Sequence, residues 1–252
     1  SHTAYCGSQN CADPEFRVKP RYAPWVDVLL RLQGPIALQH QYVFATDWMA
    51  ACGEDLGALL RPVTNLAANS GALAQVIATG PTQRHTAMPE MFVALMHSAS
   101  RELTVTTPYY VPNRSMHDAL CASAYRGVNT TLILPARNDS WFVAGASRSY
   151  YPELLDAGVH VWEFNAGLLH AKTLTVDGEL SLIGSANMDR RSFELNFENN
   201  VLIADAAVAA ALHARQLGYR DAAQAITQRD VARWSLGRRL WNNVSAMLSP
   251  IL

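Results

Sequence analysis

Several features that would assign a protein to a class are scarce in this sequence of 252 residues. It contains no run of about 18 apolar residues, so it predicts no membrane-crossing helix. Cysteine is rare and never forms a CxxC pair, which argues against a disulfide framework and against a zinc site. We expect all four cysteines to be small buried side chains, namely Cys6, Cys11, Cys52 and Cys121.

Charge is also sparse and balanced. Only 16% of the residues are charged, and the formal net charge is −1. The chain therefore lacks the basic surplus of nucleic-acid-binding proteins, and we expect no nucleic-acid partner. No group of carboxylates stands out as a metal site, so we expect neither a metal nor another cofactor. Half of the residues are apolar, which is typical of a folded globular protein. The sequence carries no signal for an oligomeric state.

What the sequence does contain is a partial internal repeat. The dipeptide GS occurs at Gly7 and at Gly184, an offset of 184 − 7 = 177 that also carries Asn10 onto Asn187. An apolar run with an acidic residue near its start follows each copy, WVDVLLRL with Asp27 and FENNVLIAD with Glu198. The first copy has a few extra residues before its run. We interpret the chain as two homologous halves, the first of them cut short.

Strands and helices alternate through the second half. Apolar and β-branched runs predict strands over residues 103–112, 128–135, 159–164, 170–176, 179–185 and 199–205. Helical patterns occupy residues 88–103, 116–127, 140–158 and 206–219. This alternation is typical of an α/β fold in which helices flank the sheets. We place the domain boundary so that residues 1–80 hold the remnant of the first half and a connection, in which VIATG is a candidate strand. Residues 81–252 then hold the complete second half with a C-terminal helix.

The chemistry is concentrated in the stretch HAKTLTVDGELSLIGSANMD, which begins at His170. His170 and Lys172 are two residues apart in an alternating run, so on a strand both side chains project from one face. The pair Asp177-Gly178 predicts a two-residue hairpin turn. The return strand would then bring its own polar residues back beside the histidine and the lysine.

The resulting group suits a phosphate. Lys172 would neutralise charge, and Ser185 and Asn187 would donate hydrogen bonds to phosphate oxygens. His170 could attack phosphorus or move a proton. Each of these residues alone has an ordinary structural interpretation, since a lone strand histidine is usually packed or at the surface and Asp177 alone is a turn residue. The combination HxKx4Dx6GSxN rarely arises by chance.

This stretch resembles the HKD signature of the phospholipase D superfamily. The match is complete, comprising His170, Lys172, Asp177, Gly184, Ser185 and Asn187. The surrounding sequence resembles the branch of bacterial cardiolipin synthases, in the segments LTVTTPYYVPN, ASRSYYPELLDAGVHVWEF, GLLHAK, NMDRRSFELNFE and LSPIL. The resemblance extends over essentially the whole chain, including GSQNCADPEFRVKPRYAPWVDVLLRLQGP near its start.

The resemblance implies a phospholipase D-like fold with pseudo-two-fold symmetry and two HKD motifs that share one groove. One histidine would form a phosphohistidine, and the other, here His170, would act as general acid and base. The expected reaction is phosphatidyl transfer between two phosphatidylglycerol molecules, which gives cardiolipin and glycerol. Lys172 and Asn187 would hold the phosphate, and Asp177 belongs to the catalytic signature.

Further roles follow from the resemblance. Ser185, Ser8 and Asn10 would bind the substrate phosphate, and Gly184 and Gly7 would close the loops beneath it. Glu198 occupies the family position where a carboxylate orients a catalytic imidazole, and Asp27 resembles its counterpart in the first half. A solvated acid at a strand edge is the alternative interpretation of Glu198.

The first motif is the main departure from the family pattern. Counting back from Gly7 puts its aspartate immediately before Ser1, with its lysine and histidine further upstream. We expect a truncated fragment that lacks the nucleophile and is inactive alone. The family's N-terminal membrane helices would be missing as well. The expected location of the whole enzyme is the bacterial inner membrane, with the fragment itself soluble or peripheral and acting on phosphatidylglycerol or another anionic phospholipid at the membrane surface.

Two alternatives remain open for the function. A phospholipase D would pass the phosphatidyl group to water, and a non-catalytic remnant would only bind lipid. A nuclease of the same superfamily fits the balanced charge less well.

The C-terminal run around Trp234 and Trp241 allows two interpretations, an amphipathic helix on anionic lipid or a docked helix with both tryptophans in the core, of which we favour the second. The tyrosine pairs 109–110 and 150–151 fit the substrate groove or the core equally well.

Overall fold

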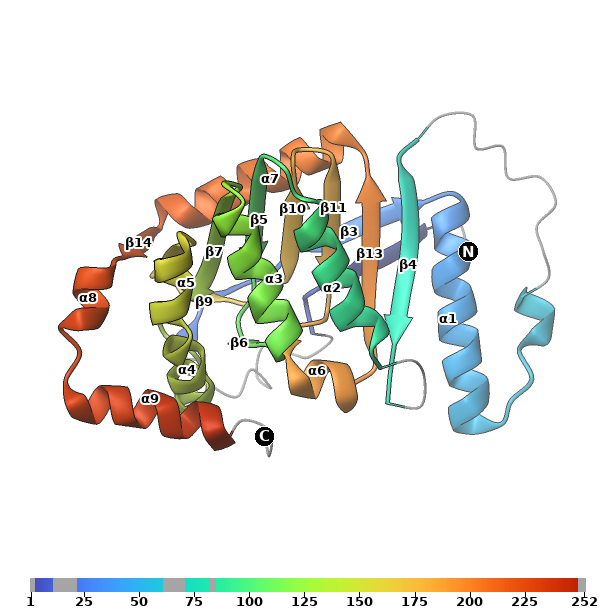
Figure 1. Ribbon diagram of the computed structural model, residues 1–252. Coiled ribbons are helices and arrows are strands. Elements are labelled where there is room, and N and C mark those ends of the chain that lie inside the picture. Colours follow the sequence, from blue (N-terminus) through green and yellow to red (C-terminus); the bar gives the residue numbers. More distant parts are fainter. Residues whose placement is uncertain (1–2, 11–21, 61–70, 82–84, 249–252) are drawn as a thin grey trace.

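The computed structural model describes residues 3–10, 22–60, 71–81 and 85–248. Within these ranges the chain is organised around a mixed sheet of eight strands in the order β14-β8-β7-β5-β10-β11-β13-β4 (Figure 1). The strands are β4 (Leu73–Thr79), β5 (Glu102–Thr106), β7 (Asn129–Pro135), β8 (His160–Phe164), β10 (Thr173–Val176), β11 (Leu180–Gly184), β13 (Glu198–Ala204) and β14 (Ala223–Ile226). β7 pairs in parallel with β5 and β8, and the other neighbours are antiparallel.

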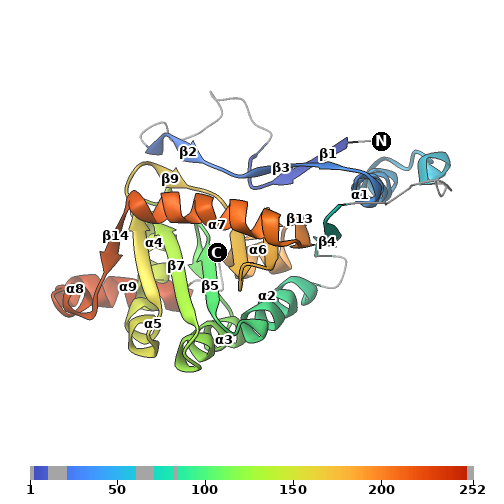
Figure 2. The same ribbon diagram turned by 90° about the horizontal axis from the view of Figure 1, so that it is seen from above.

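Helices cover both faces of this sheet. α2 (Ala87–Ser98), α3 (Arg114–Tyr125) and α5 (Tyr151–Ala157) lie on one face, and α7 (Ala206–Asp221) lies on the other (Figure 2). The central strands and the first set of helices share the main core, to which they contribute the fully buried leucines Leu103, Leu120, Leu132, Leu154 and Leu174. The expected α/β class, with a mixed sheet flanked by helices, is confirmed.

Two predicted elements are each divided in the structure, and proline explains both cases. The strand expected over residues 103–112 ends at Thr106, and β6 (Tyr110–Val111) forms a separate short pair with β12 (Met188–Asp189). Pro108 lies between them and has no N–H to donate to a ladder. The helix expected over residues 140–158 is α4 (Trp141–Ser149) followed by α5. Pro152 is tolerated in the first turn of α5 but would have broken a continuous helix.

The first part of the chain forms its own small sheet on the same side as α7 (Figure 2). β1 (Thr3–Gly7) pairs antiparallel with β3 (Leu29–Gln33), whereas β2 (Trp25–Val26) pairs in parallel with β9 (Leu168–Leu169). The apolar run over residues 25–32 is therefore divided between two strands, because its two ends pair with different partners. The remaining elements of this part are α1 (Pro35–Cys52) and the 3-10 helix η3 (Gly57–Leu60).

β4 occupies the edge of the large sheet beside β13, which confirms the strand expected in VIATG. The domain boundary after residue 80 stays a prediction. Cys6 and Cys121 are buried as expected, but Cys52 is exposed, because it is the last residue of α1 and faces solvent. Cys11 lies outside the described residues.

The C-terminal region forms α8 (Gln228–Ala232) and α9 (Leu236–Leu248). Trp234 packs against the main core, and the Trp241 ring stacks on Trp141 at a centroid distance of 4.5 Å. The C-terminal helix is thus docked on the protein as we favoured, but only Trp234 packs against the core, because Trp241 stacks on the exposed Trp141 ring. Among the described helices, none is both long enough and apolar enough to cross a bilayer.

The motif hairpin consists of β10 and β11 and differs from the prediction at both ends. Val176 pairs with Leu180, so the turn contains residues 177–179 rather than two residues. Asp177 and Gly178 both have positive φ, 54° and 72°, which is the conformation that an Asp-Gly pair favours in a hairpin turn. At the other end, His170 and Lys172 precede β10 instead of lying in it.

Asp177 fastens this turn to the junction of α2 and β5. Its carboxylate accepts hydrogen bonds from the backbone N–H groups of Ser100, Arg101 and Glu102 and from the Ser100 hydroxyl, at 2.7–2.9 Å. Partial burial raises the pKa of Asp177, but these hydrogen bonds outweigh it and lower the pKa to about 2. The carboxylate therefore stabilises the fold above its unfolded pKa, and this contribution is lost as the pH falls toward 2.

We predict that Asp177→Asn lowers the free energy of unfolding at neutral pH by about 1–3 kcal/mol, because one charged acceptor is lost while the turn conformation remains accessible to asparagine. The difference from the parent chain should shrink as the pH falls from about 4 to about 2. Urea unfolding at several pH values measures both effects. The matched control is Glu179→Gln in the same turn, whose exposed ion pair with Arg101 should contribute less than about 0.5 kcal/mol. Equal effects of the two substitutions would contradict the assigned role.

Candidate active site

His170 lies between β9 and β10, where two distant segments meet. Its backbone N–H and that of Ala171 both donate to the Val26 carbonyl, at 2.8 and 3.0 Å, which draws the chain out of the β10 ladder. The imidazole is buried and its Nδ1 lies 2.7 Å from the Asp27 carboxylate. The Trp25 ring packs beside it at a centroid distance of 4.9 Å. The residues around β2 thus fix the imidazole from one side.

Lys172 closes the other side of the imidazole. Its Nζ lies 2.8 Å from His170 Nε2 and 2.7 Å from the His170 carbonyl oxygen. Burial lowers the pKa of Lys172 to about 7, although the negative charges of Asp27, Glu198, Asp189 and Asp139 oppose this shift. The ammonium is therefore poised between its charged and neutral forms near neutral pH.

Asp27 is ionised in this arrangement. Burial raises the pKa of its carboxyl, but the hydrogen bonds from His170 and Ser8, together with the charges of His170 and Lys172, place the net pKa below the ordinary value. With the carboxylate accepting from Nδ1–H, the Nε2 atom of His170 is the one left for Lys172 and for a ligand.

The serines and acids of the two halves make equivalent contacts. The Ser8 hydroxyl donates to Asp27 at 2.7 Å and accepts from the Val28 backbone N–H. The Ser185 hydroxyl likewise donates to Glu198 and accepts from the Asn199 backbone N–H. The offset between the serines is 177 and that between the acids is 171, so the two halves differ by a short insertion in between. The partial repeat seen in the sequence is therefore a repeat of structure at this site.

Gly7 and Gly184 are also equivalent. A Cβ on Gly7 would lie 2.1 Å from the Val28 carbonyl oxygen, and one on Gly184 would lie 2.5 Å from that of Asn199. Only glycine allows the two backbone segments to approach this closely. The two glycines support the serine loops, as their place in the motif suggested.

A cavity of about 850 Å³ brings the two motifs together. The predicted residues on its wall are Ser8, Asn10, His170, Lys172, Ser185, Asn187 and Glu198. Asn187 donates its amide N–H to Ser192 at 3.0 Å, while its Oδ1 is buried with no hydrogen-bond partner among the described residues. Other lining residues were not anticipated as site residues from the sequence, among them Trp25, Asp139, Phe142, Asp189, Arg191, Leu195 and Phe197. Four of them follow the motif closely, within DRRSFELNF, and that proximity was the available signal.

The contacts of the structure bear on three expected roles. Asp177 lies at the far end of β10 and is not among the cavity residues, so its position supports a structural role and not a catalytic one. His170 is held by Asp27 from the other half and not by Glu198, so the expected role of Glu198 in orienting a catalytic imidazole stays a prediction. The hydroxyls of Ser8 and Ser185 already donate to carboxylates, which leaves Lys172, Asn187 and Asn10 as the polar side chains of the motifs that face a ligand.

Glu198 is not a solvated edge acid, because it is buried on the cavity wall. Burial raises the pKa of its carboxyl, and hydrogen bonds from Ser185, Asn196 and Ser192 offset the rise only in part. The described residues contain no group of three or more histidine, cysteine, aspartate or glutamate side chains that could hold a metal ion. The cavity thus offers an imidazole, a buried ammonium and an amide to an anionic group.

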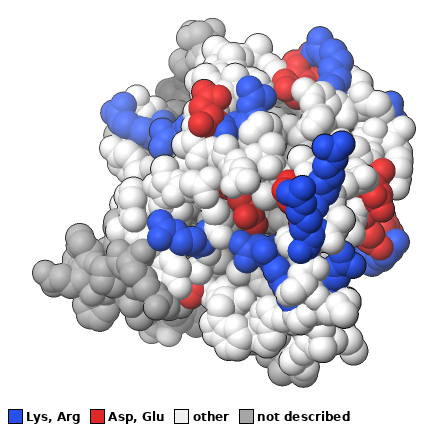
Figure 3. Space-filling view, turned by 90° about the vertical axis from the view of Figure 1, so that its left-hand side faces the viewer, with Lys and Arg blue, Asp and Glu red and all other residues white. Residues whose placement is uncertain are grey.

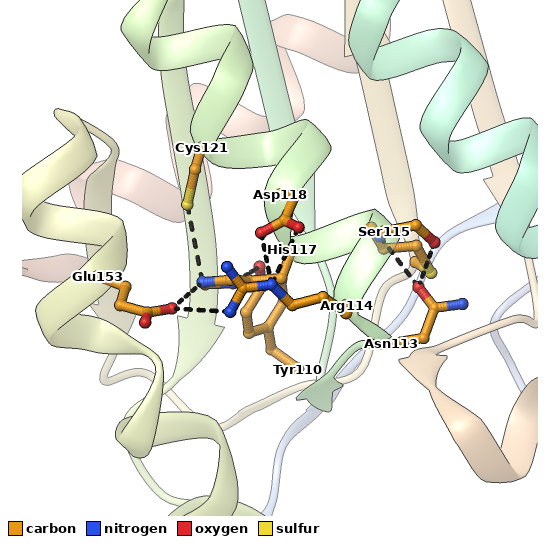
Figure 4. A network of polar contacts seen from close by, with 9 residues as sticks. Tyr110, Asn113, Arg114, Ser115, His117, Asp118, Cys121 and Glu153 are labelled. Carbon is orange, nitrogen blue, oxygen red and sulfur yellow. Dashed lines mark hydrogen bonds and ion pairs between the residues drawn. The ribbon is translucent and has the colours of Figure 1, made fainter.

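A second histidine lies in a polar network between α3 and α5 (Figure 4). His117 is buried, with Nδ1 at 3.0 Å from the Tyr110 hydroxyl and Nε2 at 2.7 Å from Glu153. The Cys121 thiol lies 3.7 Å from Nε2, but burial, followed by the charges of Glu153 and Asp118, raises the pKa of this thiol to about 11. The thiol stays protonated, and the network ties α3 to α5 and β6.

The tyrosine pairs divide between the two interpretations. Tyr109 lines the cavity and donates its hydroxyl to Asp139 at 2.7 Å, whereas Tyr110 and Tyr151 are buried in the core.

Comparison with known proteins agrees with this geometry. The family described as "Cardiolipin synthase, PLD-like domain" matches residues 92–216. The chain is 36% identical over 255 residues to cardiolipin synthase A of Buchnera aphidicola subsp. Acyrthosiphon pisum (strain APS), a match that covers 100% of this chain and 52% of the relative. The chain thus spans about half the length of the curated relatives it matches.

Solved structures share the fold at low sequence identity. Phosphatidylserine synthase of Haemophilus influenzae Rd KW20 has a TM-score of 0.60 at 12% identity, covering 89% of this chain and 62% of that one. Nuc of Salmonella typhimurium, a phospholipase D family member, has a TM-score of 0.54 at 18% identity, covering 63% of this chain and 100% of that one. Both agree with the expected phospholipase D-like fold. The chain therefore belongs to the phospholipase D superfamily, and its residues 92–216 form a PLD-like domain of the cardiolipin synthase type.

Proposed function

We propose that this chain supplies one half of the active site of a phosphatidyltransferase that converts two phosphatidylglycerol molecules into cardiolipin and glycerol. The observation that carries the proposal is the buried set Asp27, His170 and Lys172 on the wall of the cavity. A positioned imidazole can transfer a proton, and the ammonium beside it can stabilise the negative charge of a phosphoryl group. The relatives that match over the full chain are cardiolipin synthases, which supports the choice of reaction.

His170 acts as general acid and base in this proposal. In the first step a second histidine, from a first HKD motif, bonds to phosphorus. The bond to the glycerol oxygen breaks, and His170 Nε2 gives its proton to that oxygen. In the second step Nε2 takes the proton of the incoming phosphatidylglycerol hydroxyl, whose oxygen bonds to phosphorus as the phosphohistidine bond breaks. Asp27 stabilises the imidazolium present before the first transfer and after the second.

Lys172 and Asn187 hold the phosphoryl oxygens, with Asn10 on the facing wall of the cavity. Glu198 occupies the position relative to Ser185 that Asp27 occupies relative to Ser8. By that local symmetry Glu198 would orient the second imidazole as Asp27 orients His170. The substrate is an anionic phospholipid, so the protein works at a membrane surface, which we propose to be that of the bacterial inner membrane.

The product assay tests this proposal against its alternatives. The 252-residue chain alone, which contains a single HxK motif, should not convert labelled phosphatidylglycerol. A chimera that carries this chain in place of the matching part of the Buchnera cardiolipin synthase A should form cardiolipin and release glycerol in equal amounts. His170→Ala in the chimera should lower the rate by about 10³-fold or more. Phosphatidic acid as the main product would favour the hydrolase, and lipid binding without any product would favour the non-catalytic remnant. Cardiolipin formation by the chain alone would show that it needs no second motif.

Asp27 should act as a positioning residue. We predict that Asp27→Asn in the same chimera lowers kcat by about 10²–10⁴-fold with little change in KM, because an amide can hold the wrong tautomer of His170. The Nδ1–H proton resonance of His170 should disappear or shift in the NMR spectrum of this variant. Ser8→Ala, which leaves the carboxylate in place, is the control and should cost less than Asp27→Asn. A KM effect with unchanged kcat would contradict the assignment.

Lys172 should make anion binding depend on pH. We predict that the affinity of the chain for tungstate, a phosphate mimic of constant charge near neutrality, falls as the pH rises through about 7, because Lys172 loses its proton there. Isothermal titration calorimetry measures this. Lys172→Arg should retain binding at high pH, since the guanidinium stays charged, and Lys172→Met should bind weakly throughout. Any pH dependence left in Lys172→Arg arises from groups other than this lysine. The same slope in the parent chain and in Lys172→Arg would overturn the assignment.

A further inference from the structure

α9 turns its apolar residues away from the protein. Leu236, Leu240 and Met247 are 83%, 67% and 79% exposed, whereas the buried residues of the helix are Asn242 and Ser245. In a helix that packs on a water-soluble core the opposite distribution is expected. The outward face of α9 is therefore an apolar stripe without a partner among the described residues.

Helical periodicity places these residues on one stripe. Positions 236, 240, 244, 247 and 248 follow one another at intervals of four, four, three and one, which is the spacing of one helix face. Val244 and Leu248, the remaining members, are also exposed. We call this set, Leu236, Leu240, Val244, Met247 and Leu248, the α9 stripe.

The inward face of α9 is polar and packs tightly. A Cβ on Gly145 of α4 would lie 2.7 Å from the Ser245 hydroxyl and 2.8 Å from Trp241 Nε1, so the two helices touch at a glycine. Asn242 Nδ2 and Ser245 Oγ are buried there and have no hydrogen-bond partner among the described residues. Burying such groups costs free energy. α9 nevertheless buries these polar groups and leaves its leucines exposed. This distribution indicates that the α9 stripe contacts an apolar environment other than the core of the protein.

Positive charge flanks the stripe. No acidic residue occurs between Val231 and Leu248, whereas Arg233, Arg238 and Arg239 do. The Arg238 guanidinium lies 4.5 Å from the centroid of the Trp234 ring, and Arg239 donates to the Ala232 carbonyl at 2.7 Å. A band of basic side chains crosses this end of the molecule, with uncharged surface below it (Figure 3). An apolar stripe beside fixed arginines complements the acyl chains and anionic headgroups of a lipid surface.

α4 connects α9 to the cavity, because it packs on α9 and also contributes lining residues to the cavity. Trp141 is 70% exposed and stacks on Trp241, and the next residue, Phe142, lines the cavity. Two further exposed apolar residues, Leu195 and Phe197, line the same cavity. Indole rings are enriched where protein meets the headgroup layer.

We propose that the α9 stripe, together with Trp141 and the flanking arginines, is a docking surface for an anionic phospholipid bilayer, on which α9 lies in the interface plane and brings the cavity mouth to the lipid. The choice of a bilayer over a protein partner rests on the proposed function, because a lipid substrate has to leave the bilayer at this mouth. A second copy of the chain fits less well, since a two-fold contact through this face would bring the arginines of both copies together.

Vesicle cosedimentation of the 252-residue chain tests the proposal. The vesicles contain phosphatidylcholine with or without phosphatidylserine, an anionic lipid that is not the proposed substrate. The chain should bind the anionic vesicles, and binding should weaken with salt. Leu240→Glu with Met247→Glu should lower the vesicle affinity by about tenfold or more, because two apolar contacts are lost and two negative charges gained. Arg239→Gln should lower it by about fivefold.

Two control variants separate the docking surface from other surfaces. Leu73→Glu places the same charge on a leucine that is 76% exposed at the edge strand β4, and it should bind vesicles like the parent chain. Lys172→Met alters the cavity and should also leave vesicle binding unchanged. Circular dichroism and thermal unfolding establish that each variant is folded.

Several outcomes would overturn the proposal. One is that the parent chain binds neither vesicle, and another is that the α9 double variant binds as well as the parent. A third is a dimer in light scattering that the α9 double variant abolishes, which would make a second copy the occupant. Loss of vesicle binding in Lys172→Met would place the lipid in the cavity instead. Failure of the chimera to make cardiolipin, with vesicle binding intact, would count against the proposed function alone.

Discussion

The Asp27 carboxylate is the contact on which the site depends. It accepts the Ser8 hydroxyl from its own half and the His170 imidazole from the other half, across a sequence separation of 143 residues. A buried carboxylate is costly unless it is hydrogen-bonded, and both of these donors bond to its Oδ1 atom. The backbone contributes to the same junction, because β2 pairs with β9 and the Val26 carbonyl receives the N–H groups of His170 and Ala171. The geometry of the site and the packing of the two halves therefore depend on the same junction between them.

The local symmetry explains why the acids sit where they do. In each half a glycine lets the motif loop approach the neighbouring strand closely. The serine after that glycine then donates its hydroxyl to an acid, Asp27 before β3 in the first half and Glu198 at the start of β13 in the second. The acid is thereby aimed across the groove and not at the histidine of its own motif. Asp27 reaches His170 in this way, and Glu198 faces the cavity from the equivalent position. The contact of Asp27 with His170 thus makes the first part of the chain necessary for the geometry of the second.

How much of this could be predicted from the sequence depends on the range of the interactions. The glycine turn at Gly178 and the helical periodicities are local, and they predicted the hairpin of β10 and β11 and most of the helices and strands. The limits of the hairpin were wrong, because its turn has three residues and His170 and Lys172 precede β10. The offset between the two GS dipeptides also revealed the repeat. The partner of His170 could not be predicted, because it is set by the packing of β2 on β9 and not by any spacing along the chain. The partners of Asp177 could not be predicted for a similar reason, since its four hydrogen bonds go to residues 100–102, which are remote in sequence.

The buried lysine links the site to stability. Because the pKa of Lys172 is lower in the folded chain than in the unfolded one, the unfolded state binds more protons between pH 7 and 10.5, and this group's contribution to the free energy of unfolding rises with pH in that window. Near and below neutral pH the fold therefore carries the cost of a buried ammonium whose neighbouring acids compensate it only in part. An anion in the cavity would add to this compensation, because Lys172 lines the cavity and its positive charge would pair with the anion. Without a ligand the charge of the Lys172 ammonium is thus only partly compensated. Binding of an anionic phosphoryl group would remove part of this cost, and that gain in free energy would favour binding.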